Sequence, residues 1–321
     1  MNSSLLLFLG SMTLGVMVSL CSNNLITIWI GLEISLISFI PLMTDGNLLN
    51  SESSMKYFII QSLSSSLLLL GVMILIMNLI SIGDLIIYLS LLVKLGVAPF
   101  HMWVLSVVEG LNYMCLFIML FTMKLVPLFI IGLMNNELMM MALLTMMIGS
   151  ISGLIQNSIR KLFAYSSIYN LGLVILCVHN SSLWMTYFFI YGLILMLILF
   201  LITSLNFSYI NQIVMMEFNL SSKIIFWLSM LSMGGLPPFL GFINKMLIIE
   251  FLLMNDHLIL LMILIMTALL VIFYYIRLSF ISIFFSSMLK WNLVSNSSIS
   301  FLILLINLMA FPLMLLLKSL T

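Results

Sequence analysis

The sequence predicts an all-α, polytopic membrane protein. Hydrophobic residues make up 64% of its 321 residues, charged residues make up only 6%, and the mean hydropathy is +1.36. A chain with so few polar side chains cannot cover a surface that faces water, so its exterior must face lipid. The apolar residues also come in runs of about 20, which is the length that a helix needs to cross a hydrocarbon core about 30 Å thick. We therefore expect a single membrane domain over residues 1–321.

About eleven apolar runs are long enough to be membrane spans. They cover residues 4–20, 24–43, 56–80, 84–104, 111–132, 138–155, 162–178, 182–206, 223–254, 258–283 and 299–317. The ninth run is long and is broken by Pro237 and Pro238. The connections leave no room for a nucleotide-binding loop or a separate soluble domain.

Two spans carry similar interruptions, GVAPF at 96–100 and GLPPF at 235–239. Proline removes a backbone hydrogen bond and clashes with an earlier carbonyl, so we expect broken helices at both places. A simple kink is the alternative, but matching Gly and Pro interruptions in two halves indicate a transport site. The interrupted spans are the fourth and the ninth, so they run in opposite directions. We therefore predict an inverted repeat of 1–132 and 138–283, with 299–317 as an extra C-terminal helix.

The basic residues support this count and give the chain an orientation. If successive spans alternate in direction, one basic residue, Lys318, falls on the side away from the N-terminus. Six fall on the side of the N-terminus: Lys56, Arg160, Lys161, Lys223, Arg277 and Lys290. Basic residues concentrate on the side from which a chain is inserted, so we expect the N-terminus there. The longer connections, 44–55, 207–222 and 284–298, fall on that side as well.

Several charged residues lie inside the predicted spans. They are Glu33, Lys94, Lys124, Lys245 and Glu250. Each costs roughly 2.5 to 3.5 kcal/mol at the centre of a membrane helix, so we expect these side chains to face one another or water. Loss of water disfavours an ammonium ion and a nearby carboxylate favours it, so a Glu33 and Lys94 pair of variable separation could hold or release a proton. These residues are therefore candidates for a proton relay, which His101, just after the first interruption, could extend.

Composition and motifs exclude several other functions. A net charge of +1 gives no basic field for nucleic acid. The three cysteines, Cys21, Cys115 and Cys177, lie in or beside separate apolar runs, so we expect neither disulfides nor a metal site. The sequence has no nucleotide or flavin fingerprint, no cysteine cluster for iron–sulfur and no paired histidines for haem, so we expect no redox centre in this chain.

Three functions are compatible with these patterns. The first is a proton-conducting subunit whose energy comes from a partner, and the second is a stand-alone cation/proton antiporter. A sodium site would need several carboxylates and carbonyls at mid-depth, which a lone Glu33 disfavours. The third, a packing scaffold, leaves the lysines inside the spans unexplained.

Five stretches of the chain resemble a known family. They are WIGLEISLISFIPL around Glu33, KLGVAPFHMW around Lys94, MKLVPL around Lys124, IRKLFAYSSI at 159–168, and LSMGGLPPFLGFINKMLIIE through Lys245. Together they are similar to the chain 2 family of NADH-ubiquinone oxidoreductase, mitochondrial respiratory complex I, over almost the whole chain. The eleven predicted spans look like the shortened animal mitochondrial form of this antiporter-like subunit.

The resemblance has several implications. It assigns proton-pathway roles to Glu33, Lys94, Lys124 and Lys245. It implies a multi-pass protein of the mitochondrial inner membrane, with the N-terminus in the matrix and the C-terminus on the intermembrane-space side. It implies lipids and other membrane-arm subunits as partners, including further antiporter-like subunits. NADH, FMN, iron–sulfur clusters and ubiquinone are then expected in partner subunits.

The chain departs from the family at one place. The family commonly continues past the tryptophan with a proline and an acidic or amide residue, whereas Leu105 and Ser106 stand in those places after Trp103. We therefore expect a straighter end to the fourth span, and the role of Glu109 is left open.

Overall fold

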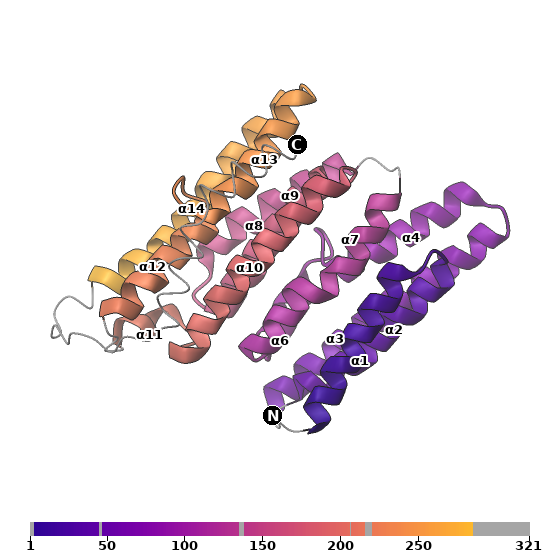
Figure 1. Ribbon diagram of the computed structural model, residues 1–321, viewed down its shortest axis with the longest axis horizontal. Coiled ribbons are helices and arrows are strands. Elements are labelled where there is room, and N and C mark those ends of the chain that lie inside the picture. The colour runs from indigo at the N-terminus through magenta and orange to yellow at the C-terminus, as the bar shows by residue number, and fades with distance from the viewer. Residues whose placement is uncertain (1–2, 45–46, 135–137, 206, 216–219, 285–321) are drawn as a thin grey trace. The chain divides into compact units, whose positions relative to one another are not determined.

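The computed structural model describes residues 3–44, 47–134, 138–205, 207–215 and 220–284 (Figure 1). Regular structure within these residues is helical, and β-type pairing there is limited to an isolated bridge between Ser158 and Tyr209. The predicted all-α class is confirmed. The predicted span at 299–317 lies outside the described residues.

The chain divides by its internal contacts into two units, Met1–Thr145 and Met146–Thr321. Helices α1 and α2 form one hairpin in the first unit and α3 and α4 form another, with α2 packed on α3 (Figure 1). The elements of this unit are α1 Ser3–Cys21, α2 Leu25–Met43, α3 Leu48–Ile76, α4 Ile80–Leu95, α5 Met102–Val108, α6 Tyr113–Phe117, the π-helix η1 Ile118–Thr122, α7 Met123–Leu133 and the start of α8 Met139–Ile155.

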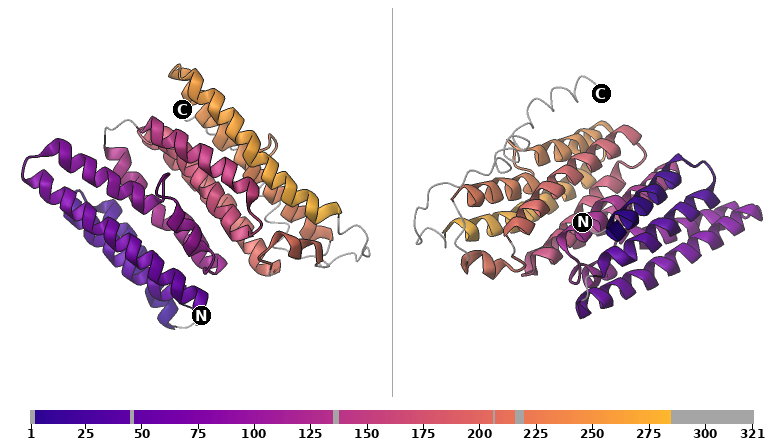
Figure 2. Two further views of the ribbon diagram at one scale, coloured as in Figure 1. Left: turned by 180° about the vertical axis from the view of Figure 1, so that it is seen from behind. Right: turned by 60° about the horizontal axis from the view of Figure 1, so that its bottom comes forward.

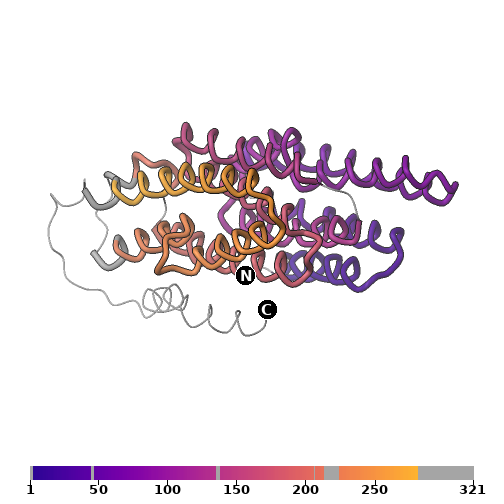
Figure 3. Tube along the Cα trace, turned by 90° about the horizontal axis from the view of Figure 1, so that it is seen from above, coloured from indigo at the N-terminus to yellow at the C-terminus, as the bar shows by residue number. Residues whose placement is uncertain are grey.

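The second unit, which begins within α8, is also helical. Helices α12 and α14 pack side by side, and α10 packs against α12 and α13 (Figure 2). Helices α13 and α14 are joined by a short turn and run alongside each other (Figure 3). The remaining elements are α9 Ile159–Leu176, α10 Ser181–Leu205, α11 Ile210–Met215, α12 Leu220–Gly234, α13 Leu240–Met254 and α14 Leu258–Phe284.

The helices have the length and surface of membrane spans. Within the described residues, six helical segments are long and apolar enough to cross a membrane. Their outward faces carry large apolar side chains, such as Leu7 and Leu14 of α1, which are 73% and 65% exposed. Such a surface is stable in lipid and not in water, so this is a polytopic membrane protein. The count of eleven spans and the inverted repeat of 1–132 and 138–283 stay predictions.

One predicted boundary is wrong. Residues 44–55 are predicted to form a connection, whereas α3 begins at Leu48. Glu52 and Lys56 form an ion pair at 2.5 Å with the i, i+4 spacing that supports a helix. The first turns of α3, which were not predicted, also pack on Gly110, where a Cβ atom would stand 2.4 Å from the Leu49 carbonyl oxygen. Polar composition alone therefore did not mark the helix start.

The first predicted break, at 96–100, is confirmed. Helix α4 ends at Leu95 and α5 begins at Met102. Gly96 has a φ of 72°, a left-handed conformation that disfavours any residue with a side chain. The Val97 amide donates to the Leu92 carbonyl at 3.1 Å and the Gly96 amide donates to the Val93 carbonyl at 3.1 Å, which is a Schellman motif.

The second predicted break, at 235–239, is confirmed and ends its helix in the same way. Helix α12 ends at Gly234 and α13 begins at Leu240. Gly235 has a φ of 75°. The Leu236 amide donates to the Leu231 carbonyl at 3.4 Å, and the Gly235 amide donates to the Ser232 carbonyl at 3.1 Å. The shared Gly-x-x-Pro-Phe sequence thus gives the same backbone termination twice.

Candidate functional site

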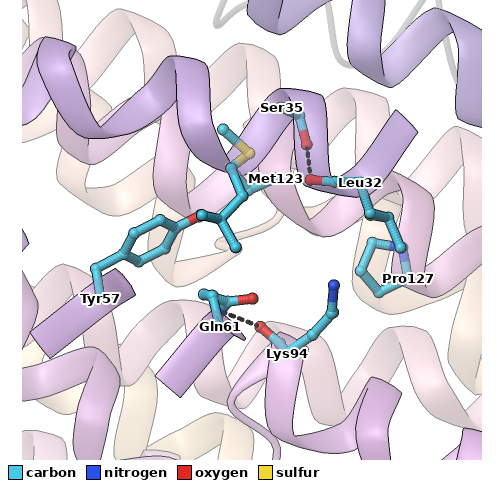
Figure 4. Close-up of a pocket in the computed structure, with 8 residues that line it drawn as sticks. Leu32, Ser35, Tyr57, Gln61, Lys94, Met123 and Pro127 are labelled. Carbon is cyan, nitrogen blue, oxygen red and sulfur yellow. Dashed lines mark hydrogen bonds between the residues drawn. The ribbon is translucent and has the colours of Figure 1, made fainter. Parts of the chain in front are cut away.

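Lys94 lies in the last turn of α4, two residues before Gly96, and is buried. Its ammonium group points into a small cavity (Figure 4). The cavity is lined by residues of α2, α3, α4 and α7, namely Leu32, Ser35, Leu36, Tyr57, Gln61, Lys94, Met123 and Pro127. Its volume is about 20 Å³, and a single water needs roughly 10 to 15 Å³. The ammonium can therefore be hydrated inside the membrane domain.

Neighbouring side chains donate hydrogen bonds to two carbonyl groups at the break. The Gln61 amide donates to the Lys94 carbonyl at 3.2 Å, and the Trp103 indole donates to the Val93 carbonyl at 3.0 Å. The Lys94 ammonium itself donates to no protein group within the described part of the chain. The backbone of the break is thus stable without it, and the ammonium is left to interact with cavity water.

Glu33 is the acidic residue of α2, and its neighbours in the sequence line this cavity. It is half-buried, and Leu32 and Ser35 beside it line the cavity. Its carboxylate is close enough for its charge to act on Lys94, but the two do not form a direct ion pair in the described structure. The structure therefore brings Glu33 and Lys94 near each other without a direct contact between their charged groups.

Lys124 is the second residue of α7, which directly follows the π-helix η1, and it is buried. The residue before it, Met123, lines the Lys94 cavity, whereas Lys124 does not. π-Helical turns are rare and frequently stand at functional sites. Lys124 thus lies close to the cavity along the chain, in a position set by an irregular turn.

Lys245 lies in the second turn of α13 and is also buried. Its ammonium donates a hydrogen bond to the carbonyl of Gly234, the last residue of α12. A Cβ atom on Gly235 would stand 2.8 Å from Lys245 Cε, so the glycine leaves room for the lysine side chain. Lys245 therefore joins the two halves of the second broken helix.

The other predicted site residues are more accessible. His101 is half-buried in the first break, with Nδ1 at 3.2 Å from the Pro99 carbonyl oxygen. Glu250 is exposed on α13, and Glu109 is exposed just after α5. Burial thus separates the three lysines from the remaining titratable candidates.

Sequence reasoning missed the polar residues that share the cavity with Lys94. Gln61 and Tyr57 are buried on α3 and Ser35 is buried on α2. A signal was present, because Tyr57 and Gln61 are four residues apart in a predicted span and so lie on one face of a helix. An amide within a predicted span is thus a further indication of a polar cavity beside a buried lysine.

Titratable side chains do not gather in the described residues as a metal site would require. Groups of three or more His, Cys, Asp or Glu side chains are absent there. Cys115 and Cys177 carry buried thiols, and Cys21 carries an exposed one.

Comparisons with known proteins agree on the family. The family described as NADH:quinone oxidoreductase/Mrp antiporter, transmembrane, matches residues 22–79 and 76–271. The NADH-ubiquinone oxidoreductase chain 2 of Anopheles gambiae is 41% identical over 309 residues, which cover 90% of this chain and 89% of that protein. The chain belongs to the NADH-ubiquinone oxidoreductase chain 2 family. The resemblance found in the sequence motifs is thereby confirmed.

Solved structures give the same fold for this chain 2 family member. A chain of respiratory complex I from Thermus thermophilus superposes with a TM-score of 0.84 at 19% identity, covering 98% of this chain and 80% of that chain. A chain of the Mrp complex from a Dietzia species superposes with a TM-score of 0.77 at 15% identity, covering 85% of this chain and 59% of that chain. At these identities the likeness concerns the fold.

Proposed function

We propose that this chain is a proton-translocating membrane subunit of respiratory NADH:ubiquinone oxidoreductase in the mitochondrial inner membrane. Family membership supports the complex, because the curated relative from Anopheles gambiae is a chain of that enzyme at 41% identity. The observation that carries the proton role is the buried Lys94 ammonium, which faces a cavity large enough for water. A stand-alone antiporter is less well supported because the name of this relative places it in the redox enzyme.

Lys94 would act as a protonatable station controlled by Glu33. Removal of water weakens the hold of an amine on its proton, and a nearby carboxylate strengthens it. A change in the distance between Glu33 and Lys94, or in the water between them, would therefore change the proton occupancy of Lys94. Moving one charge across 100 mV takes about 2.3 kcal/mol, so such a station must swing by roughly 1.7 pKa units.

Lys124 and Lys245 would be further stations of the relay, because both are buried lysines next to helix irregularities. His101 and Glu250 are more accessible. We assign them the exchange of protons between the buried lysines and the surface. The two inverted units, 1–132 and 138–283, would each hold part of this relay.

The redox chemistry would belong to partner subunits. In this proposal NADH, FMN, iron–sulfur clusters and ubiquinone bind elsewhere in the complex, and this chain couples their reactions to proton movement. The purified chain should then be colourless. A visible absorbance band present in stoichiometric amount with the chain would contradict this division of roles.

The orientation follows from the basic residues of the sequence. We propose a matrix-side N-terminus and a C-terminus on the intermembrane-space side. Protease access in oriented inner-membrane vesicles tests this. The N-terminus should be cut from one side of the membrane and the C-terminus from the other. Cleavage of both from one side would refute the orientation.

The central test uses the assembled complex that carries Lys94→Ala. We expect proton uptake and coupled quinone reduction to fall while the complex stays abundant, because no backbone group loses its partner. Lys94→Arg should not restore them, because a guanidinium releases its proton far too reluctantly. Lys56→Ala is the matched control, since Lys56 is a partly exposed lysine paired with Glu52. Normal pumping with Lys94→Ala would reduce Lys94 to a structural charge.

A further inference from the structure

The interior of the second unit holds five buried tyrosines, which we call the tyrosine cluster. Each is at most 5% exposed. Tyr169 comes from α9, Tyr187 and Tyr191 come from α10, and Tyr274 and Tyr275 come from α14. The rings of Tyr274 and Tyr275 are 4.6 Å apart between centroids. Three helices thus direct phenol groups into one apolar interior.

Most hydroxyls of the tyrosine cluster are not satisfied by protein. The Tyr187 hydroxyl donates to Asn170 Oδ1 at 2.7 Å. The buried polar atoms without a hydrogen-bond partner here are the hydroxyls of Tyr169, Tyr191, Tyr274 and Tyr275 and Oδ1 of Asn244. Each such atom destabilises the fold if it stays unpaired. So many orphaned groups in one small region indicate missing partners, and internal water is the usual one.

The hydroxyls lie close to polar side chains without reaching hydrogen-bonding geometry. Tyr275 approaches Ser166, and Tyr169 approaches Thr267. The Ser166 and Thr267 hydroxyls donate to backbone carbonyls of their own helices, so they are left as acceptors. Polar groups that are near but not in contact are those that a water molecule bridges.

The tyrosine cluster borders the second broken helix. Asn244, the residue before Lys245, donates from Nδ2 to the Tyr187 carbonyl at 3.3 Å. Tyr275 packs beside Gly234, with its Cβ atom 3.8 Å from the position that a Gly234 Cβ would take. The Gly234 carbonyl in turn accepts the hydrogen bond from Lys245. The tyrosine cluster therefore packs against the broken helix that holds Lys245.

We propose that the tyrosine cluster binds internal water and, with Asn170 and Asn244, forms the proton path that serves Lys245. This rests on the proposed function. A phenol hydroxyl both donates and accepts, so it can take a proton from one water while its own proton passes to the next. Each O–H bond that forms is matched by one that breaks, and no tyrosine keeps a charge.

The test is the double variant Tyr191→Phe with Tyr275→Phe in the assembled complex. Neither hydroxyl forms a hydrogen bond with protein in the described residues, so their removal breaks no such bond, and a purely structural role predicts little change in stability and activity. The proposal predicts loss of proton translocation at unchanged abundance of the complex. Tyr88→Phe is the control, because it removes another buried, unpartnered hydroxyl, from α4 in the first unit.

Two further measurements separate this inference from the proposed function. Lys245→Ala that abolishes pumping together with a double variant that pumps normally would overturn the tyrosine path and leave the relay standing. Lys245→Ala that pumps normally would overturn the tyrosine path and the role of Lys245 in the relay, whereas the role of Lys94 is tested separately by Lys94→Ala. A high-resolution map of the complex should show ordered water within hydrogen-bonding distance of Tyr191 and Tyr275, and a dry interior at that resolution would refute the water site.

Discussion

At the first break the Lys94 carbonyl accepts a hydrogen bond from the Gln61 amide, whereas at the second the Gly234 carbonyl accepts one from the Lys245 ammonium. The two backbones end alike, with a left-handed glycine and a Schellman motif. The difference lies in which side chain satisfies the carbonyl that the break leaves free. At the first break a neutral side chain does so, and at the second the lysine does so itself.

This difference assigns the two lysines different physical properties. Proton loss from Lys94 disturbs no backbone hydrogen bond, so Lys94 can titrate while the break keeps its shape. Proton loss from Lys245 converts a charge-assisted hydrogen bond into a weaker neutral one. The geometry of the second break should therefore depend on the protonation of Lys245, and that of the first break should not depend on Lys94.

The largest effect is expected from substitution of the left-handed glycines, Gly96 and Gly235, which both breaks share. Gly96→Ala forces a side chain into a left-handed conformation, at roughly 1 to 2 kcal/mol, and its Cβ would stand 2.4 Å from Val104 Cγ2 in a packed interior. We expect little assembled complex on native gels. Gly235→Ala has the same backbone cost but meets the flexible Lys245 side chain, so more complex should survive. Equal abundance of the two variants would contradict the comparison.

The next effect comes from replacing each lysine by methionine, which keeps an unbranched, slightly shorter side chain and removes its charge. Lys245→Met leaves the Gly234 carbonyl without its donor and should cost about 1 to 3 kcal/mol more than Lys94→Met. The thermal unfolding midpoint of the complex in detergent measures this. Equal midpoints would mean that Lys245 does not stabilise the break.

Gln61→Leu tests the partner at the first break directly. It removes the donor to the Lys94 carbonyl, but cavity water can replace that donor, so we expect a loss of about 1 kcal/mol. Ser62→Ala, the adjacent position on α3, is the control. A loss as large as that of Lys245→Met would show that the cavity does not supply water to this carbonyl.

The smallest effect is expected from Trp103→Phe. The Trp103 indole donates to the Val93 carbonyl, which also accepts from the Gly96 amide. Because the carbonyl keeps one partner, the cost should be about 0.5 to 1 kcal/mol. The same unfolding measurement applies, and a cost near that of Gly96→Ala would mean that the indole holds the break in place.

Features set by local backbone preferences could be predicted from the sequence, whereas features set by contacts between distant residues could not. GVAPF and GLPPF predicted both breaks because glycine and proline act on their own backbone. The partners of the lysines were not predictable in this way, since Gln61 is 33 residues from Lys94. The burial of Lys94, Lys124 and Lys245 follows from their place in apolar runs. The tyrosine cluster was missed because it depends on how α9, α10 and α14 pack.

The π-helix before Lys124 has a consequence for insertions and deletions in the chain. Ile118–Thr122 carries one residue more per turn than an α-helix would. Deleting one residue there would restore a continuous α-helix and rotate Met123–Leu133 relative to Tyr113–Phe117 by about 100°. Lys124 would then leave the buried face of α7 although the length and hydropathy of the span barely change. A single extra residue in the π-helix thus sets the direction in which Lys124 points. A count of apolar residues in the span cannot reveal this residue.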